Sequence, residues 1–118
     1  MTPLTAVTSP TGRVVVVAPS GSLGVDDCAS LRAVLREACP DAGLVVVDLL
    51  DVDEVDDAVV GVLVGAASRC RAAGVGFVVA NAHRQPWTAL TRARVAGVLR
   101  LHRRGAEPIA ELLQLLEL

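Results

Sequence analysis

The residues of this chain whose types and spacing could do chemistry are six carboxylates in the run 48–57. They are Asp48, Asp51, Asp53, Glu54, Asp56 and Asp57. Carboxylate oxygens are the ligands that Mg²⁺ and Ca²⁺ prefer, so Asp51, Asp53, Asp56 and Asp57 could together bind a divalent cation. A solvated acidic loop is the commoner use of such residues, and we expect no metal here.

Phosphotransfer is the other chemistry that such carboxylates perform. Asp51-Val52-Asp53 is similar to the Asp-x-Asp of haloacid-dehalogenase-like phosphatases, and Asp48 stands where a response-regulator receiver holds its phosphorylated aspartate. Both families also use a lysine, whereas all 11 basic residues of this chain are arginine. The same absence excludes a P-loop or a Schiff base from this chain alone. We therefore expect no enzyme, no catalytic residue and no cofactor.

The histidines and cysteines add no recognisable site. His83 and His102 have no serine or cysteine partner at a nucleophile turn, so we expect solvated or capping roles, with His83 near the loop after Asp48. The three cysteines fit no metal spacing, and their odd number argues against a disulfide framework. We expect buried, reduced thiols at Cys28, Cys39 and Cys70.

A buried strand and a helix must position the acidic run. Leu44 to Val47 is an apolar, valine-rich run typical of a strand buried on both faces. After the run the period changes to that of a helix, from about Ala58 to Ala73. Its sheet-facing side is predicted to carry Val60, Leu63, Val64 and Ala67. Loops beyond the strand ends of an α/β domain commonly carry function, so we place the candidate site here.

The rest of the chain alternates strands and helices after an N-terminal hairpin. This alternation predicts a single α/β domain over residues 1–118, with a mixed, mostly parallel sheet of about five strands and about four helices. The hairpin strands are 4–7 and 13–18, around a turn at 9–12. The further elements are a helix from Asp26 to Pro40, a strand 75–80, a loop from Asn81, a helix 86–96 ended by Gly97, an edge strand 98–102 and a helix 107–117.

Composition indicates a globular protein: 53% of residues are hydrophobic and the mean hydropathy is +0.54. The apolar runs are too short to span a bilayer, and no signal peptide is visible, so we expect a cytoplasmic protein without a membrane partner. The net charge of −2 gives no electrostatic case for nucleic acid. The arginine-rich stretch 92–104 could meet an acidic partner, although a solvated face is the commoner role. Trp87 is expected to cover the core.

The acidic run and its flanks resemble the signature of STAS domains, the fold of the bacterial anti-sigma factor antagonists. Val45-Val46-Val47-Asp48-Leu49 match the end of the family's hydrophobic strand. Residues 56–63 fall on its pattern Asp-Ser-Ser-Gly-Leu-Gly-Val-Leu, with Asp56 on the aspartate and Gly61 on the second glycine. Residues 19–24 are similar to the Gly-x-Leu-Asp segment before the first helix, with Gly24 where aspartate is usual.

The main departure from the family pattern is at its phosphorylated serine, which falls on Asp57. The second serine falls on Ala58 and the first glycine on Val59. Asp57 could mimic the phosphorylated state and weaken partner binding, or it could suit a partner with a complementary arginine or lysine. It could also serve simply as the N-cap of the helix, worth about 1 kcal/mol over alanine. The sequence does not choose among these.

The side of the second helix away from the sheet is smooth, which suggests a docking surface. On the predicted helix it carries Ala58, Gly61, Val62, Gly65 and Arg69. Two glycines inside a helix cost about 1 kcal/mol each relative to alanine, and a solvated face gains nothing from them. With Asp56, Asp57 and the loop residues Ser22, Leu23 and Gly24, this side forms the predicted partner-binding site. The alternative is that the glycines allow tight packing within the fold, or are tolerated.

The resemblance implies a regulatory function through protein binding. We expect an anti-sigma factor antagonist-like protein that docks on an anti-sigma factor, a kinase-fold protein of the serine kinase type, and so controls sigma factor availability. Phosphorylation at Asp57 in the usual way is excluded, so control would come from another site such as Ser22, from expression or from a partner STAS protein. The alternatives are a non-catalytic subunit of a larger signalling assembly and a small-ligand-binding module. We expect a monomer or weak homodimer.

Overall fold

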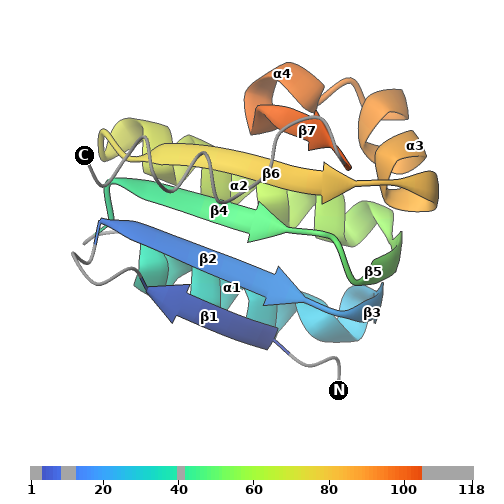
Figure 1. The fold of residues 1–118 in the computed structure, drawn as a ribbon, viewed down its shortest axis with the longest axis horizontal. Helices are drawn as coiled ribbons and strands as arrows, with labels where there is room; N and C mark the ends of the chain where they lie inside the picture. The colour runs from blue at the N-terminus through green and yellow to red at the C-terminus, as the bar shows by residue number, and fades with distance from the viewer. Residues whose placement is uncertain (1–3, 9–12, 40–41, 105–118) are drawn as a thin grey trace.

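The apolar runs of the chain pair into one five-stranded sheet (Figure 1). The computed structural model describes residues 4–8, 13–39 and 42–104. The strands, in their order across the sheet, are β1 (Leu4–Thr8), β2 (Val14–Pro19), β4 (Leu44–Asp48), β6 (Gly76–Ala82) and β7 (Leu101–Arg103). β1 is antiparallel to β2, and the other neighbours are parallel. The predicted α/β fold with an N-terminal hairpin and a mostly parallel sheet is confirmed; the turn 9–12 lies outside the described residues.

Two short strands that the sequence patterns did not predict form a separate sheet. β3 (Gly21–Leu23) and β5 (Val52–Val55) pair in parallel. Both segments were expected to be loop, and that expectation was wrong. β5 buries Val52 and Val55 and exposes the two acidic residues between them, a pattern too short to be distinguished from a loop by periodicity.

Two long helices pack on the same face of the sheet, α1 (Cys28–Ala38) and α2 (Asp57–Ala72) (Figure 1). A 3₁₀ turn, η1 (Val25–Asp27), leads into α1. The bounds of both long helices agree with the sequence prediction to within two residues. Helix α1 buries Cys28, Leu31 and Leu35, as its apolar stripe predicts.

The C-terminal part of the described chain departs from the predicted bounds. β6 continues to Ala82, past the expected loop start, and α3 (Arg84–Arg92) replaces the expected helix 86–96. Arg94 has a φ of 58°, and this left-handed conformation ends α3. Gly97, expected to follow the predicted helix, instead lies inside a separate short helix, α4 (Ala96–Leu99). The edge strand β7 begins three residues later than predicted. The predicted helix 107–117 lies outside the described residues.

The hydrophobic core fills the space between the sheet, α1 and α2. Leu44, Val45, Val46 and Val47 are all buried, which confirms the prediction of a strand covered on both faces. Val45 and Val47 belong to the larger cluster, whereas Leu44 and Val46 join a smaller one with neighbours from β2 and β6. None of the described helices is long and apolar enough to cross a membrane.

The three cysteines are buried and form no disulfide, as predicted. Burial raises the pKa of the Cys70 thiol to about 12, and a hydrogen bond with Cys39 adds to the shift. A thiol with so high a pKa carries almost no thiolate at neutral pH and is a poor nucleophile. Trp87 is half-buried against the larger core cluster, as expected, and the Arg103 guanidinium lies 5.4 Å from its ring centroid.

Candidate functional site

The acidic run begins at the carboxyl end of β4, where Asp48 has a structural role. Its Oδ1 accepts two hydrogen bonds, each at 3.0 Å: one from the backbone N–H of Leu50 and one from the side-chain amide of Asn81. His83 lies beside this turn, as predicted, with Nε2 3.0 Å from the Leu50 carbonyl oxygen. Asp48 therefore joins the β4–β5 turn to the end of β6.

The β3–β5 pair brings the two predicted docking segments side by side. The Gly21 N–H donates to the Asp51 carbonyl at 2.9 Å, and the Asp56 N–H donates to the Leu23 carbonyl at 3.0 Å. Residues of both segments line a groove of about 330 Å³, namely Ser22, Leu23, Gly24, Glu54, Val55 and Asp56. Leu23, predicted to contact a partner, is only 3% exposed and belongs to the core, so it is withdrawn from the docking site.

Helix α2 is capped by Asp56 and not by Asp57. Asp56 has extended backbone angles, and its carboxylate accepts from the Ala58 N–H at 3.0 Å. Asp57 is the first residue of the helix; it is exposed, and its carboxylate hydrogen-bonds to none of the described residues. The hypothesis that Asp57 is merely the N-cap is therefore wrong. Its negative charge still lies where the helix dipole favours it.

The buried side of α2 is wider than predicted and includes Val62. This residue, expected on the exposed docking side, is 5% exposed and belongs to the core, while Val64, expected to face the sheet, is half-buried. The cause is that α2 packs against α1 as well as on β6. Val62 is therefore withdrawn from the docking site. The exposed positions at the start of the helix are Asp57, Ala58 and Gly61.

The two glycines of α2 are not required for packing inside the described chain. A Cβ added at Gly61 would meet nothing within 4 Å, and one at Gly65 would meet only the Arg69 guanidinium, at 3.5 Å. Arg69 is half-buried, and its Nη2 has no hydrogen-bond partner in the described part of the chain. The hypothesis that Gly61 allows tight internal packing is thus excluded, which leaves tolerance or an external partner.

Helix α3 supports the acidic run through a side chain that sequence reasoning missed. The Gln85 Oε1 accepts from the Val55 N–H at 2.8 Å, and its Nε2 donates to the Val55 carbonyl at 3.1 Å. This amide pairs with the edge of β5 that β3 leaves open. Its partner is main chain 30 residues away, so no local sequence signal could have indicated it.

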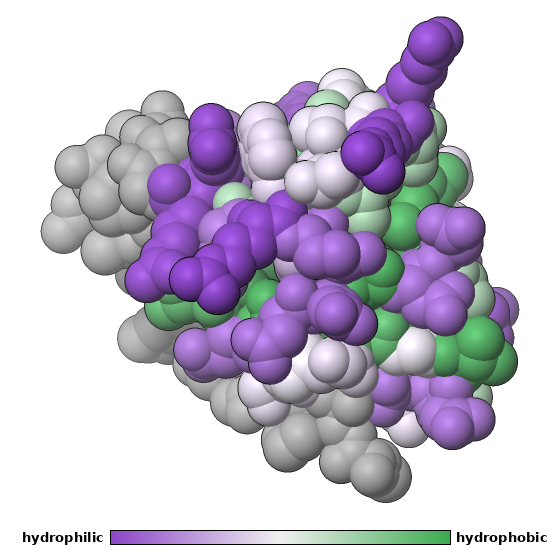
Figure 2. All heavy atoms as spheres, turned by 90° about the vertical axis from the view of Figure 1, so that its right-hand side faces the viewer, coloured by the Kyte–Doolittle hydropathy of each residue, from purple (hydrophilic) through white to green (hydrophobic). Residues whose placement is uncertain are grey.

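A second groove, of about 580 Å³, separates α2 from α3. Asp57 and Val60 line it from α2, and five residues line it from α3 and the turn that follows. Those five are Gln85, Thr88, Ala89, Arg92 and Ala93. Figure 2, which faces this end of the molecule, shows a mostly hydrophilic surface broken by smaller hydrophobic patches. Val25, next to Gly24, is 66% exposed, the most exposed large apolar residue described. The sequence patterns did not indicate this exposure.

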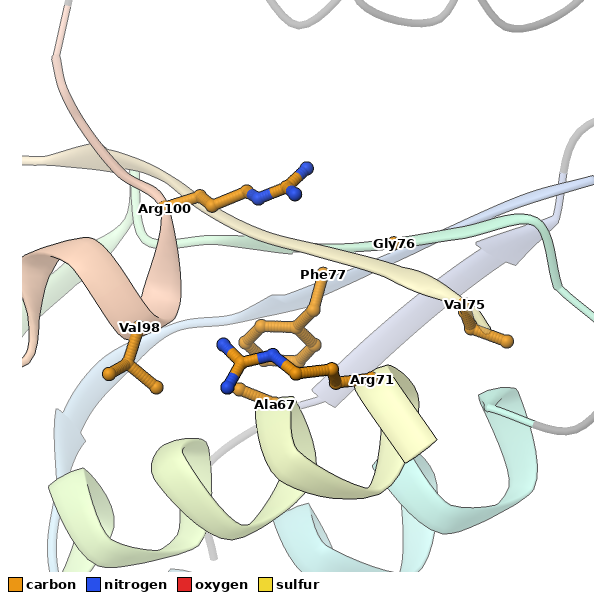
Figure 3. A pocket seen from close by; sticks show the side chains of 7 residues that line it. All are labelled: Ala67, Arg71, Val75, Gly76, Phe77, Val98 and Arg100. Carbon is orange, nitrogen blue, oxygen red and sulfur yellow. The ribbon is translucent and has the colours of Figure 1, made fainter. Parts of the chain in front are cut away.

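The predicted carboxylates are not gathered into a metal site in the described part of the chain. Within residues 4–8, 13–39 and 42–104, no three His, Cys, Asp or Glu side chains could hold a metal ion. A cavity of about 70 Å³ lies at the other end of the sheet, between Phe77, Val98 and the side chains of Arg71 and Arg100 (Figure 3). Its volume is far below the roughly 300–1,000 Å³ of small-molecule sites.

The comparisons with known proteins agree with this geometry. A family described as "Mlab, STAS domain" matches residues 7–103. No curated protein matches the chain by sequence. An anti-sigma factor antagonist from Mycobacterium paratuberculosis has a similar structure, with 16% identity, a TM-score of 0.78, and coverage of 98% of this chain and 95% of that chain.

Two structures of the antagonist SpoIIAA are also similar. The unphosphorylated form has 15% identity and a TM-score of 0.75, with 97% of each chain covered. The phosphorylated form, from Bacillus, has 16% identity and a TM-score of 0.69, with 95% of this chain and 99% of that chain covered. At such identities the likeness establishes the fold alone.

Proposed function

Because the chain belongs to the STAS domain family, we propose that it is an anti-sigma factor antagonist-like regulatory protein. In this proposal it docks on an anti-sigma factor of the serine kinase type and thereby frees a sigma factor in the cytoplasm. The function requires binding and no catalysis by this chain. The similar structures that are antagonists by name support the proposal, since the fold is the same along nearly the whole chain.

The observation that carries the proposal is the bare surface at the start of α2. The docking surface consists of Ser22, Gly24, Asp56, Asp57, Ala58, Gly61 and Gly65, with Arg69 at its edge. Ala58 and Gly61 are exposed, and the space above Gly61 is empty within the described chain. A solvated helix position with glycine loses about 1 kcal/mol relative to alanine, whereas a close partner backbone would require the small residue.

The exposed carboxylate of Asp57 bears on regulation. A carboxylate carries one negative charge and lacks the three acceptor oxygens of a phosphoserine, so it reproduces only part of that group. Asp57→Ser removes the charge and leaves the Asp56 cap in place. Stronger partner binding by this variant would identify Asp57 as a built-in inhibitory charge; weaker binding would identify it as a partner contact.

Affinity capture from a lysate of the source organism tests the proposal. Gly61→Arg fills the empty space of the docking surface, and Ala72→Arg places the same side chain at the exposed end of the same helix as a control. We expect wild type and Ala72→Arg to retain a kinase-fold protein and Gly61→Arg to lose it, as read by mass spectrometry. If no variant retains a kinase-fold protein, the antagonist function is wrong.

A further inference from the structure

A surface rich in arginine lies next to the acidic run and is not part of the proposed docking surface. Its residues, here called the arginine surface, are Arg84, Arg92, Arg94, Arg103 and Arg104 on and around α3 and β7, all of them exposed. Residues 81–104 contain no aspartate or glutamate. The stacking of Arg103 on Trp87 joins the β7 part of this surface to α3.

Two of these arginines occupy backbone positions that disfavour them. Arg84 has a φ of 50° and Arg94 a φ of 58°, in the left-handed region where glycine or asparagine is more stable than other residues. Neither position gains a described hydrogen bond or ion pair from its guanidinium. The left-handed residue at 94 follows the C-terminus of α3 and ends that helix.

The complementary surface is the acidic strip, defined as Asp51, Asp53, Glu54, Asp56 and Asp57, all exposed. α3 packs directly on β5, and the groove between α2 and α3 has Asp57 on one wall and Arg92 on the other. The two surfaces are therefore neighbours at the same end of the molecule. Nevertheless no ion pair joins any of these ten side chains within the described residues.

We propose that the arginine surface binds the acidic strip of a second copy of this chain in a two-fold symmetric dimer. Because the two surfaces are adjacent and opposite in charge, rotation about an axis between them places each strip against the partner's arginines, twice per dimer. Guanidinium groups pair with carboxylates in a bidentate geometry. An extended polyanion, such as nucleic acid or an anionic membrane, would also face the acidic strip and be repelled.

Such a dimer must be weak and sensitive to salt, since exposed ion pairs contribute little individually and are screened. It uses Asp56 and Asp57 of the docking surface, so dimerisation and partner binding would compete. The inference does not depend on the proposed function, because its test requires only the purified chain.

Sedimentation velocity with charge-swapped variants tests the dimer. One variant carries Arg92→Glu with Arg94→Glu, and the other carries Asp53→Arg with Glu54→Arg; all four side chains are exposed. At about 0.03 M salt we expect wild type to dimerise. At about 0.5 M salt the dissociation constant of the dimer should be at least about tenfold higher, because the charges are screened. Each variant alone should be monomeric, and their equimolar mixture should form a dimer, because both interfaces are then attractive again.

Three results would overturn the inference: wild type that stays monomeric at low salt and high concentration, variants that dimerise as wild type does, or a mixture that does not associate. Species growing beyond the dimer would overturn the two-fold arrangement. Circular dichroism verifies that each variant is folded. A second pair, Arg84→Glu and Asp51→Arg, repeats the test at independent positions if either double variant fails to fold.

Discussion

The two sides of helix α2 differ sharply in burial. One side buries seven residues against the sheet and α1, among them Val62, Leu63 and Cys70. The other, at the start of the helix, exposes Ala58 and Gly61, and the space above Gly61 is empty within the described chain. The buried side stabilises the fold, whereas the exposed side contributes almost nothing to it. Residues on the exposed side are therefore free to be selected for binding.

The sharpest test of this difference uses the same substitution at two consecutive positions. Val62→Arg places a charge in the core and should lower the free energy of unfolding by about 4 kcal/mol or more. Gly61→Arg should change it by less than about 1 kcal/mol, since the side chain enters solvent. Urea denaturation measures both; Val62→Ala, expected to cost about 2 kcal/mol, replaces Val62→Arg if that variant does not fold. Equal effects at 61 and 62 would contradict the assigned sides.

The segment that leads into α2 depends on Gln85. Gln85→Ala leaves the N–H and carbonyl of Val55 without their side-chain partners and should lower stability by about 1–3 kcal/mol. Thr88→Ala, on the same helix, removes one exposed hydroxyl that bonds to the Arg84 carbonyl and should cost less than about 0.5 kcal/mol. Hydrogen exchange of the Val55 amide gives the local measurement; unchanged protection in Gln85→Ala would refute this role.

Alkaline pH should lower the free energy of unfolding through Cys70, which lies on the buried side of α2. Its pKa is raised by burial from 9.0 to about 12 in the folded state, so the unfolded chain loses the thiol proton first. Stability is therefore unaffected below about pH 9 and falls above it, by at most about 1.4 kcal/mol per pH unit. The chain has no lysine or tyrosine, whose side chains would otherwise add a pH dependence in the same range.

Urea denaturation between about pH 7.5 and pH 10.5, with a reducing agent present, measures this dependence. Cys70→Ala should be less stable at neutral pH, because it leaves a cavity, but its stability should change less above pH 9. A variant that keeps the full alkaline slope would show that Cys70 is not its source.

The smallest expected effect has the opposite sign. Gly61→Ala should raise the free energy of unfolding by about 0.5–1 kcal/mol, because helical backbone favours alanine and the added methyl meets no atom. Gly74→Ala is the matched control: its Cβ would also meet nothing, but its φ of 73° disfavours any side chain, so the substitution should destabilise by about 1 kcal/mol. A destabilising Gly61→Ala would mean that the surface at 61 is not open.

Local sequence patterns were sufficient for most of the framework. The valine run 44–47 and the helical periods of α1 and α2 predicted a parallel sheet with helices against it, because apolar periodicity reports burial directly. The departures at Asp57 and Ala58 from the STAS pattern were also visible without a structure. Arg94 gave no such signal, because arginine is not a residue that usually ends a helix with a positive φ.

Contacts between distant segments decided the rest, because their partners are main-chain groups or other helices with no local signature. The pairing of β3 with β5 rests on backbone hydrogen bonds between residues about thirty apart, such as Gly21 with Asp51. The burial of Val62 follows from the packing of α1 against α2. The N-cap of α2 is Asp56, one residue before the position considered from the sequence. A helix period specifies which residues share a side; only the packing of neighbouring elements selects how wide the buried side becomes.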